Sequence, residues 1–206
     1  MVRTIAKDHD QKRQKILKEA AKVFAREGIS RSSMQQVASQ CGISKANIYH
    51  YYNGKDALLF DILDTYLSNL ANKLTSLELS NLSPEEQLER CIEAIILAYE
   101  GMDNEHKIQS EGLPLLPKQQ QKILKDYQKK MVSYVAAIVE QIVTKDAKVT
   151  TQTSMKDDNS AIKIRDITMS IFGMLNWFYM WNTKGDVARR KEYASVVSEL
   201  CIKGIS

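Results

Sequence analysis

The chain has 206 residues, 44% of them hydrophobic, with 29 Lys and Arg, 25 Asp and Glu, and only three cysteines. This length suffices for a buried core in one large domain or two small ones, and the odd number of widely separated cysteines argues against a disulfide framework. The longest strongly apolar stretch, residues 169–181, is shorter than the roughly 20 residues of a membrane span, and the charged N-terminus lacks the apolar core of a signal peptide. We therefore expect a soluble, cytoplasmic protein.

The net charge of +4 is distributed unevenly along the chain. Residues 1–60 contain 11 Lys and Arg against 5 Asp and Glu, a net charge of +6, which leaves −2 for the rest. A basic first third on a nearly neutral body is typical of a DNA-reading domain. The alternative is a basic surface that serves only solubility.

The first predicted element is a helix that follows a mobile basic arm. We expect the arm at residues 1–10, because chain ends are often poorly ordered, and the helix from Gln11 to Glu27. Gly28 stands where a C-terminal glycine is expected. The helix is predicted to complete a three-helix core with the next two helices. Its inward face at helical spacing comprises Ile16, Ala20, Val23 and Phe24.

Residues 33–55 contain two short helical patterns joined by a glycine. Gly42 permits a left-handed backbone at little steric cost, and Ser44 can cap the second helix by accepting a backbone N–H. Ala38 is small enough to let the two helices cross closely, and Ile48 can turn back onto the first helix. These features predict a helix-turn-helix, whose second helix enters the major groove of DNA.

The second helix presents polar side chains away from this core. Asn47 can pair with adenine, Lys45 can donate to guanine or phosphate, and the Ala46 methyl can contact a thymine methyl. Ser32 or Ser33 is expected to cap the first helix of the helix-turn-helix, and the N-terminus of that helix is a natural phosphate site. The alternative is an ordinary solvated face. The predicted DNA-binding residues are Ser32, Ser33, Ser44, Lys45, Ala46, Asn47, Tyr49, His50, Tyr51 and Lys55.

The tract IYHYYNGKDALL, residues 48–59, resembles the end of the DNA-binding domain of TetR-family transcriptional regulators. The one departure is Tyr52, where Phe is more usual, and a phenol there needs a hydrogen-bond partner or a wet edge. The resemblance implies that Tyr49, Tyr51 and Lys55 clamp the DNA backbone. Upstream residues that also match in spacing are Phe24, Gly28, Ser32, Val37, Ala38, Gly42, Ile43 and Ser44.

Beyond the helix-turn-helix, apolar periodicity predicts five more helices, and the polar stretch over residues 103–111 is expected to form a short sixth, which makes an all-α protein of about nine helices. The second of the six has a clear start, because Ser83 can cap it, Pro84 fits its first position and Glu86 completes a capping box. Residues 144–160 have no helical period, and we expect a flexible loop there. The six predicted helices span residues 55–77, 84–101, 103–111, 118–143, 161–182 and 187–201.

This layout predicts a helix-turn-helix DNA-binding domain at residues 1–54 and a helical ligand-binding and dimerisation domain at residues 55–206. The helix from Lys55 can convert ligand binding into a change in the distance between the two DNA-binding domains of a dimer. The alternative is that it is a rigid spacer. The helix over residues 161–182 is apolar on most sides, so it is expected to be buried on more than one of them. The TetR resemblance implies that the last two helices form a dimer bundle, which places two heads on a near-palindromic operator.

No catalytic constellation is recognisable. The histidines His9, His50 and His106 are scattered, and the sequence has no nucleophile elbow, phosphate loop or zinc spacing. We therefore expect no enzyme activity, no cofactor and no metal.

The resemblance implies a homodimeric repressor released from DNA by a small-molecule effector, and the C-terminal layout faintly resembles regulators that sense acyl-CoA or aromatic-acid metabolites. The alternatives are plain core packing at each candidate pocket residue, and a ligand-independent DNA-organising or partner-binding protein on the same fold. The candidate ligand-binding residues are Tyr99, Met102, His106, Met131, Tyr134, Phe172, Asn176, Trp177 and Tyr179.

Overall fold

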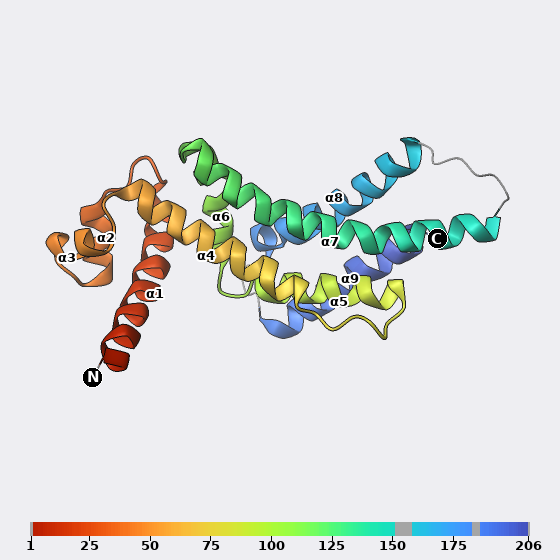
Figure 1. The fold of residues 1–206 in the computed structure, drawn as a ribbon, viewed down its shortest axis with the longest axis horizontal. Helices are drawn as coiled ribbons and strands as arrows, with labels where there is room; N and C mark the ends of the chain where they lie inside the picture. Colours follow the sequence, from red (N-terminus) through yellow and green to blue (C-terminus); the bar gives the residue numbers. More distant parts are fainter. Residues whose placement is uncertain (1, 151–157, 183–185, 206) are drawn as a thin grey trace. The chain divides into compact units, whose positions relative to one another are not determined.

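The computed structural model describes residues 2–150, 158–182 and 186–205. Over these ranges the chain is all-α, with nine α-helices, one short 3₁₀ helix and no strand, which confirms the predicted class (Figure 1). No helix in these ranges is long and apolar enough to cross a membrane. The elements are α1 Val2–Glu27, α2 Met34–Cys41, α3 Lys45–Tyr51, α4 Lys55–Thr75, α5 Pro84–Ala98, α6 Asp103–Gly112, η1 Leu113–Leu115, α7 Lys118–Thr150, α8 Asp158–Trp181 and α9 Val187–Ile205.

The chain divides into two compact units. Unit 1 comprises residues 1–68 and 101–125, and unit 2 comprises residues 69–100 and 126–206, so α4 and α7 each contribute to both. Unit 1 is larger than the predicted DNA-binding domain because it also includes the first part of α4, the whole of α6 and η1, and the start of α7. The functional division after residue 54 stays a prediction.

Unit 1 is built on the predicted three-helix core. Figure 1 shows α1, α2 and α3, in red to orange, gathered at the N-terminal part of α4. Val23, Ala38 and Ile48 have no exposed surface, which confirms their predicted inward positions. Helix α6 approaches α4 closely, because a Cβ added at Gly112 would lie 3.1 Å from a methyl carbon of Leu59. The Lys107 ammonium also donates to the Ala25 carbonyl oxygen in α1 at 2.8 Å.

Two predicted flexible segments are helical instead. Helix α1 begins at Val2, so the mobile arm is wrong for residues 2–10, which contain no glycine or proline to stop the helix. Helix α7 continues to Thr150 and α8 begins at Asp158, so the loop is wrong for residues 144–150 and 158–160. Residues 151–157 lie outside the described ranges. Lysine and alanine within residues 144–150 favour a helix, whereas threonine, valine and aspartate there do not, so intrinsic propensity alone does not explain the extension.

The other predicted helix ends shift by a few residues. Helix α4 stops two residues early at Thr75, and α5 stops at Ala98, ahead of Gly101, which has a left-handed φ of 69°. Helix α9 runs on to Ile205 instead of stopping at Cys201. The remaining differences at α6 and α8 are within the usual spread of helix boundaries.

Unit 2 is organised around α5, which packs against α8 and α9. The predicted capping box at its start is confirmed: the Ser83 hydroxyl accepts the Glu86 N–H, and the Glu86 carboxylate accepts the Ser83 N–H at 2.8 Å. Leu88 and Ile92 of α5 and Phe178 of α8 are fully buried in the core of this unit. The start of α5 is also tied to α7 by an ion pair between Glu85 and Lys145.

Candidate DNA-binding site

The turn between α2 and α3 has the predicted geometry. Gly42 has a φ of 71° and a ψ of 31°, which is left-handed backbone. Its N–H donates to the Ser39 carbonyl at 3.1 Å, and the Ile43 N–H reaches back to the Ala38 carbonyl at 3.0 Å. This pair of bonds satisfies the last carbonyls of α2, as expected of a glycine C-cap. The turn therefore fixes the direction in which α3 leaves α2.

Serine side chains cap both helices. Ser33, rather than Ser32, caps α2: its hydroxyl accepts the Gln36 N–H at 3.2 Å. Ser32 is buried, and its hydroxyl donates to the Gly28 carbonyl at 2.7 Å. Ser44 caps α3 by accepting the Asn47 N–H at 3.1 Å, as predicted. Of the two serines before α2, only Ser33 is exposed at the helix N-terminus.

Helix α3 has one buried anchor and an exposed polar face. Ile48 is fully buried, and Tyr51 is half-buried with its ring stacked on His9 of α1, the ring centroids 4.9 Å apart. This contact with α1 was not predicted, since no local pattern joins residues so far apart in the sequence. The predicted base- and phosphate-contacting side chains that are exposed are Ser33, Ser44, Lys45, Ala46, Asn47, Tyr49 and His50.

Lys55 lies at the start of α4 and is half-buried. Its ammonium donates to the carbonyl oxygens of Ser30 and Ser32, each at 3.0 Å. A lysine has three donors, so one N–H remains for another acceptor. The side chain therefore holds the loop in front of α2, and its contact with DNA stays a prediction.

A polar cluster behind α3 was not predicted as a unit. The Tyr52 hydroxyl donates to Asp61 Oδ2 at 2.6 Å, and Arg13 Nε donates to the same oxygen at 2.9 Å. Arg13 Nη2 also pairs with Asp61 Oδ1. Burial raises the pKa of the Tyr52 phenol, with a further rise from Asp61, so the phenol stays protonated and acts as the donor. Of the two predicted environments for the Tyr52 phenol, a hydrogen-bond partner or a wet edge, the structure has the first, and the identity of the partner was not predicted.

Among the ligand-binding candidates in unit 2, Tyr99 and Asn176 meet directly. The Tyr99 hydroxyl donates to Asn176 Oδ1 at 2.7 Å, and burial raises the pKa of this phenol. Tyr99 and Met131 also line a small cavity of about 10 Å³, which is room for about one water molecule. The other lining residues are Leu70, Lys73, Leu74, Ala94, Ile95 and Ala98.

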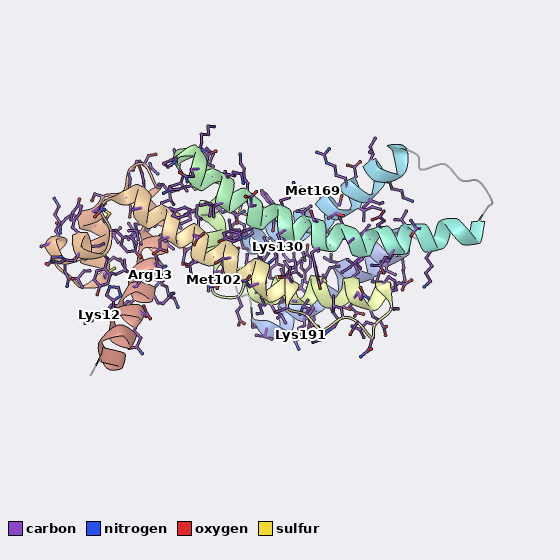
Figure 2. The ribbon with its side chains drawn as sticks, in the orientation of Figure 1. Lys12, Arg13, Met102, Lys130, Met169 and Lys191 are labelled. Atoms are coloured by element: carbon purple, nitrogen blue, oxygen red, sulfur yellow. The ribbon has the colours of Figure 1, made fainter. Side chains whose placement is uncertain are left out.

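The remaining ligand-binding candidates have different surroundings. Phe172 is buried and Tyr134 and Tyr179 are half-buried, whereas Trp177 is 61% exposed. Met102, labelled in Figure 2, is exposed.

Met102 and His106 belong to unit 1, where the His106 ring nitrogen Nδ1 lies 2.7 Å from the Tyr66 hydroxyl. The nine residues are thus divided between the two units, and their role in binding a ligand stays a prediction. Within the described part of the chain, no group of three or more His, Cys, Asp or Glu residues is arranged to hold a metal ion.

Comparison with known families gives two matches that together span most of the chain. Residues 16–62 match the family described as bacterial regulatory proteins, tetR family. Residues 81–205 match the family described as tetracyclin repressor-like, C-terminal domain.

Curated relatives of the chain are also transcriptional regulators of the helix-turn-helix type. The chain is 33% identical over 87 residues to the uncharacterized HTH-type transcriptional regulator YerO of Bacillus subtilis, covering 41% of this chain and 30% of YerO. It spans less than half the length of YerO and of two further curated regulators that it matches.

Among solved structures, a TetR-family transcriptional regulator from Bordetella parapertussis superimposes with a TM-score of 0.78, at 25% identity, over 92% of this chain and 93% of that one. The regulator AibR, solved with isovaleryl coenzyme A and operator DNA, superimposes with a TM-score of 0.72 at 22% identity, over 93% and 98% of the two chains. At 22% identity, the similarity to AibR shows a shared fold and no more. Because a family match covers more than half of the sequence and the helix-turn-helix has the expected geometry, the chain belongs to the TetR family of bacterial transcriptional regulators.

Proposed function

We propose that this protein is a homodimeric repressor that binds a near-palindromic operator and is released from it by a small-molecule effector. The observation that carries the proposal is the exposed polar face of α3, which is anchored by the fully buried Ile48 and capped by Ser44. A short helix that is anchored on its buried face and carries hydrogen-bond donors and acceptors on its exposed face fits the major groove.

In this proposal, contacts with DNA divide into two kinds. Lys45 and Asn47 lie on the exposed face of the first turn of α3, where recognition helices contact base edges. Ser33, Tyr49 and Tyr51 are assigned to phosphates, which set register and salt dependence but do not read sequence. Lys55 can join them through the one donor that its two carbonyl partners leave unused.

A second copy of the chain is the expected partner for α8 and α9. Met169, labelled on α8 in Figure 2, is 50% exposed, and Trp177 in the same helix is 61% exposed. In α9, Val196 and Leu200 are 50% and 62% exposed. Large apolar side chains exposed on two neighbouring helices mark an interaction surface. Two-fold pairing through it supports two recognition helices on one duplex.

The effector is proposed to enter unit 2 beside Tyr99. Ligand pockets usually measure about 300–1,000 Å³, so a cavity of about 10 Å³ must open before it admits a metabolite. Apart from Tyr99 and Lys73 the residues that line the cavity are apolar, and the Tyr99 hydroxyl could exchange its bond with Asn176 for one with a ligand. An acyl-CoA is the first candidate class, because AibR was solved with isovaleryl coenzyme A. An aromatic acid is the second.

The small size of the cavity also favours one alternative. A DNA-organising or partner-binding protein on the same fold needs no effector and no pocket. In that case the closed packing around Tyr99 and Met131 would be the permanent state of unit 2.

Thermal unfolding with a panel of acyl-CoA thioesters and aromatic acids separates these two functions. A ligand at 100 times its dissociation constant is expected to stabilise the protein by about 2.7 kcal/mol. The same compound should release the protein from its DNA site, since an effector acts by favouring the conformation that binds DNA less well. A compound that stabilises without releasing DNA contradicts the repressor mechanism, and no shift with any class favours the alternative.

A further inference from the structure

One carboxylate lies at the meeting point of three helices in unit 1. Asp61 in α4 accepts hydrogen bonds from Tyr52, the C-cap residue of the recognition helix α3, and from Arg13 in α1. Arg13 uses Nε and Nη2 to hold both carboxylate oxygens, which is the bidentate arrangement that fixes relative orientation best. Figure 2 labels Arg13 on α1.

The bonds of Asp61 to Arg13 and Tyr52 are partly shielded from solvent. The Asp61 side chain is 19% exposed and that of Arg13 is 34% exposed, so solvent screens the pair only in part. Tyr52 is 7% exposed, and its backbone N–H closes α3 by donating to the Ile48 carbonyl at 3.0 Å. The same residue thus ends the recognition helix and carries the hydroxyl that reaches α4.

The Tyr52 hydroxyl is not required to fill space. A phenylalanine ring, which is more usual at this position in the TetR-family pattern that residues 48–59 resemble, would occupy nearly the same volume and bury the same apolar surface. What the hydroxyl adds is a directional bond of 2.6 Å to Asp61. A directional bond from a helix end to a carboxylate that is itself held by Arg13 restricts how α3 can tilt against α1 and α4.

We propose that Asp61 is a positioning residue for DNA recognition, which holds α3 at the angle needed for base contacts through Tyr52 and Arg13. The inference rests on the proposed function, because it assumes that α3 reads DNA. A misplaced recognition helix loses base contacts while retaining most contacts with phosphates, since the latter tolerate small shifts. The specific signature is therefore a lower ratio of specific to non-specific DNA affinity.

The experiment compares three purified variants with the wild-type protein: Asp61→Asn, Tyr52→Phe and Asp64→Asn. Asp64 is the matched control, because it lies in α4 one turn beyond Asp61 and loses the same charge. Dissociation constants are measured for a selected operator duplex and for a scrambled duplex at one salt concentration, alongside urea unfolding.

We expect Asp61→Asn to lower the specificity ratio about tenfold, because it removes the charge and one acceptor oxygen from the Arg13 pair, and Tyr52→Phe about threefold, because it removes one hydrogen bond to Asp61. Asp64→Asn should leave the ratio unchanged. The double variant Asp61→Asn with Tyr52→Phe should lose less than the product of the two single losses, because both changes act on the Tyr52–Asp61 bond, which the Asn oxygen keeps in a weaker, neutral form.

Three results overturn the inference. An unchanged ratio in folded Tyr52→Phe and Asp61→Asn shows that the cluster does not position α3. Parallel losses of specific and non-specific affinity that follow the loss of unfolding free energy show a purely structural role. If the wild-type protein selects no duplex at all, the proposed function fails and the inference falls with it, an outcome distinct from selective wild-type binding with unaffected variants.

Discussion

The Lys55 ammonium lies 3.0 Å from the Ser32 carbonyl oxygen, so a residue predicted to bind phosphate also closes the loop in front of α2. A second bond of the same length reaches the Ser30 carbonyl. The two roles are compatible, because the loop carbonyls fix the ammonium near the N-terminus of α2, where the exposed Ser33 lies. A lysine fixed in this way loses little further freedom when a phosphate arrives.

The variant Lys55→Ala tests both roles. It should lower the free energy of unfolding by about 1 kcal/mol, because two loop carbonyls lose a charged donor that is partly exposed. It should also weaken binding to all duplex sequences and reduce the salt slope by about 1, as expected for one lost phosphate contact. Titrations at several salt concentrations measure the slope, and urea unfolding measures the stability. A lower stability with an unchanged slope would remove Lys55 from the phosphate contacts.

Glu105 in α6 is predicted to destabilise the protein when ionised. It is 8% exposed, its Oε2 has no hydrogen-bond partner within the described residues, and burial raises its pKa above the ordinary 4.5. Lys18 and Lys22 of α1 oppose this shift, whereas Asp103 adds to it. An acid with a raised folded pKa binds more protons when folded, so its contribution to stability falls as pH rises from about 4.5 through the folded pKa.

The variant Glu105→Gln should therefore raise the free energy of unfolding at pH 7 by about 1 kcal/mol. It should also reduce the decline of stability between mildly acid and neutral pH. Glu111→Gln, at an exposed position of the same helix, is the matched control and should change neither. Urea unfolding across a pH series checks both effects. A less stable Glu105→Gln protein would mean that the carboxylate has favourable partners in solution.

His9 is predicted to support Tyr51 at the edge of the recognition helix, because the two rings stack with an angle of 22° between their planes. Such a pair contributes about 0.5–1.5 kcal/mol beyond its buried area. His9→Ala should weaken operator binding by about threefold, and His9→Phe should restore most of it by keeping a ring in place. Equal losses in both variants would show that the imidazole itself, and not the stacking, matters for DNA.

Trp177 is predicted to lie in the dimer interface, since it is among the most exposed large apolar residues in the described structure. Trp177→Asp should shift the protein from dimer to monomer at micromolar concentration, because it places a charge in an apolar contact. Leu115→Asp, at another exposed apolar residue in η1, is the control and should stay dimeric. Sedimentation equilibrium measures the masses. A dimer that survives Trp177→Asp would place the interface elsewhere.

Features set by residues close together in the sequence were predicted well. Gly42, Ser44 and Ser83 act on backbone groups within a few residues of themselves, and each has the predicted geometry. The Arg13–Asp61 pair spans 48 positions, so no local pattern could have identified it.

Two features that the sequence did not predict have physical explanations. The helical continuation of α7 to Thr150 was missed because a polar helix lacks the apolar period on which the prediction relied. The contact of His106 with Tyr66 in unit 1 could not be predicted, since helical spacing does not say which unit a helix joins.

Selection of binding sites from random duplex DNA at physiological salt, with the wild-type protein and Asn47→Ala, tests the central claim most directly. Asn47 is exposed in the first turn of α3 and is assigned to a base edge. We expect a near-palindromic site, with Asn47→Ala losing about 1–3 kcal/mol of discrimination at one base pair of each half-site. Failure of the folded, dimeric wild-type protein to enrich any sequence, with and without the effector panel, would contradict the assignment of α3 as a reader of DNA.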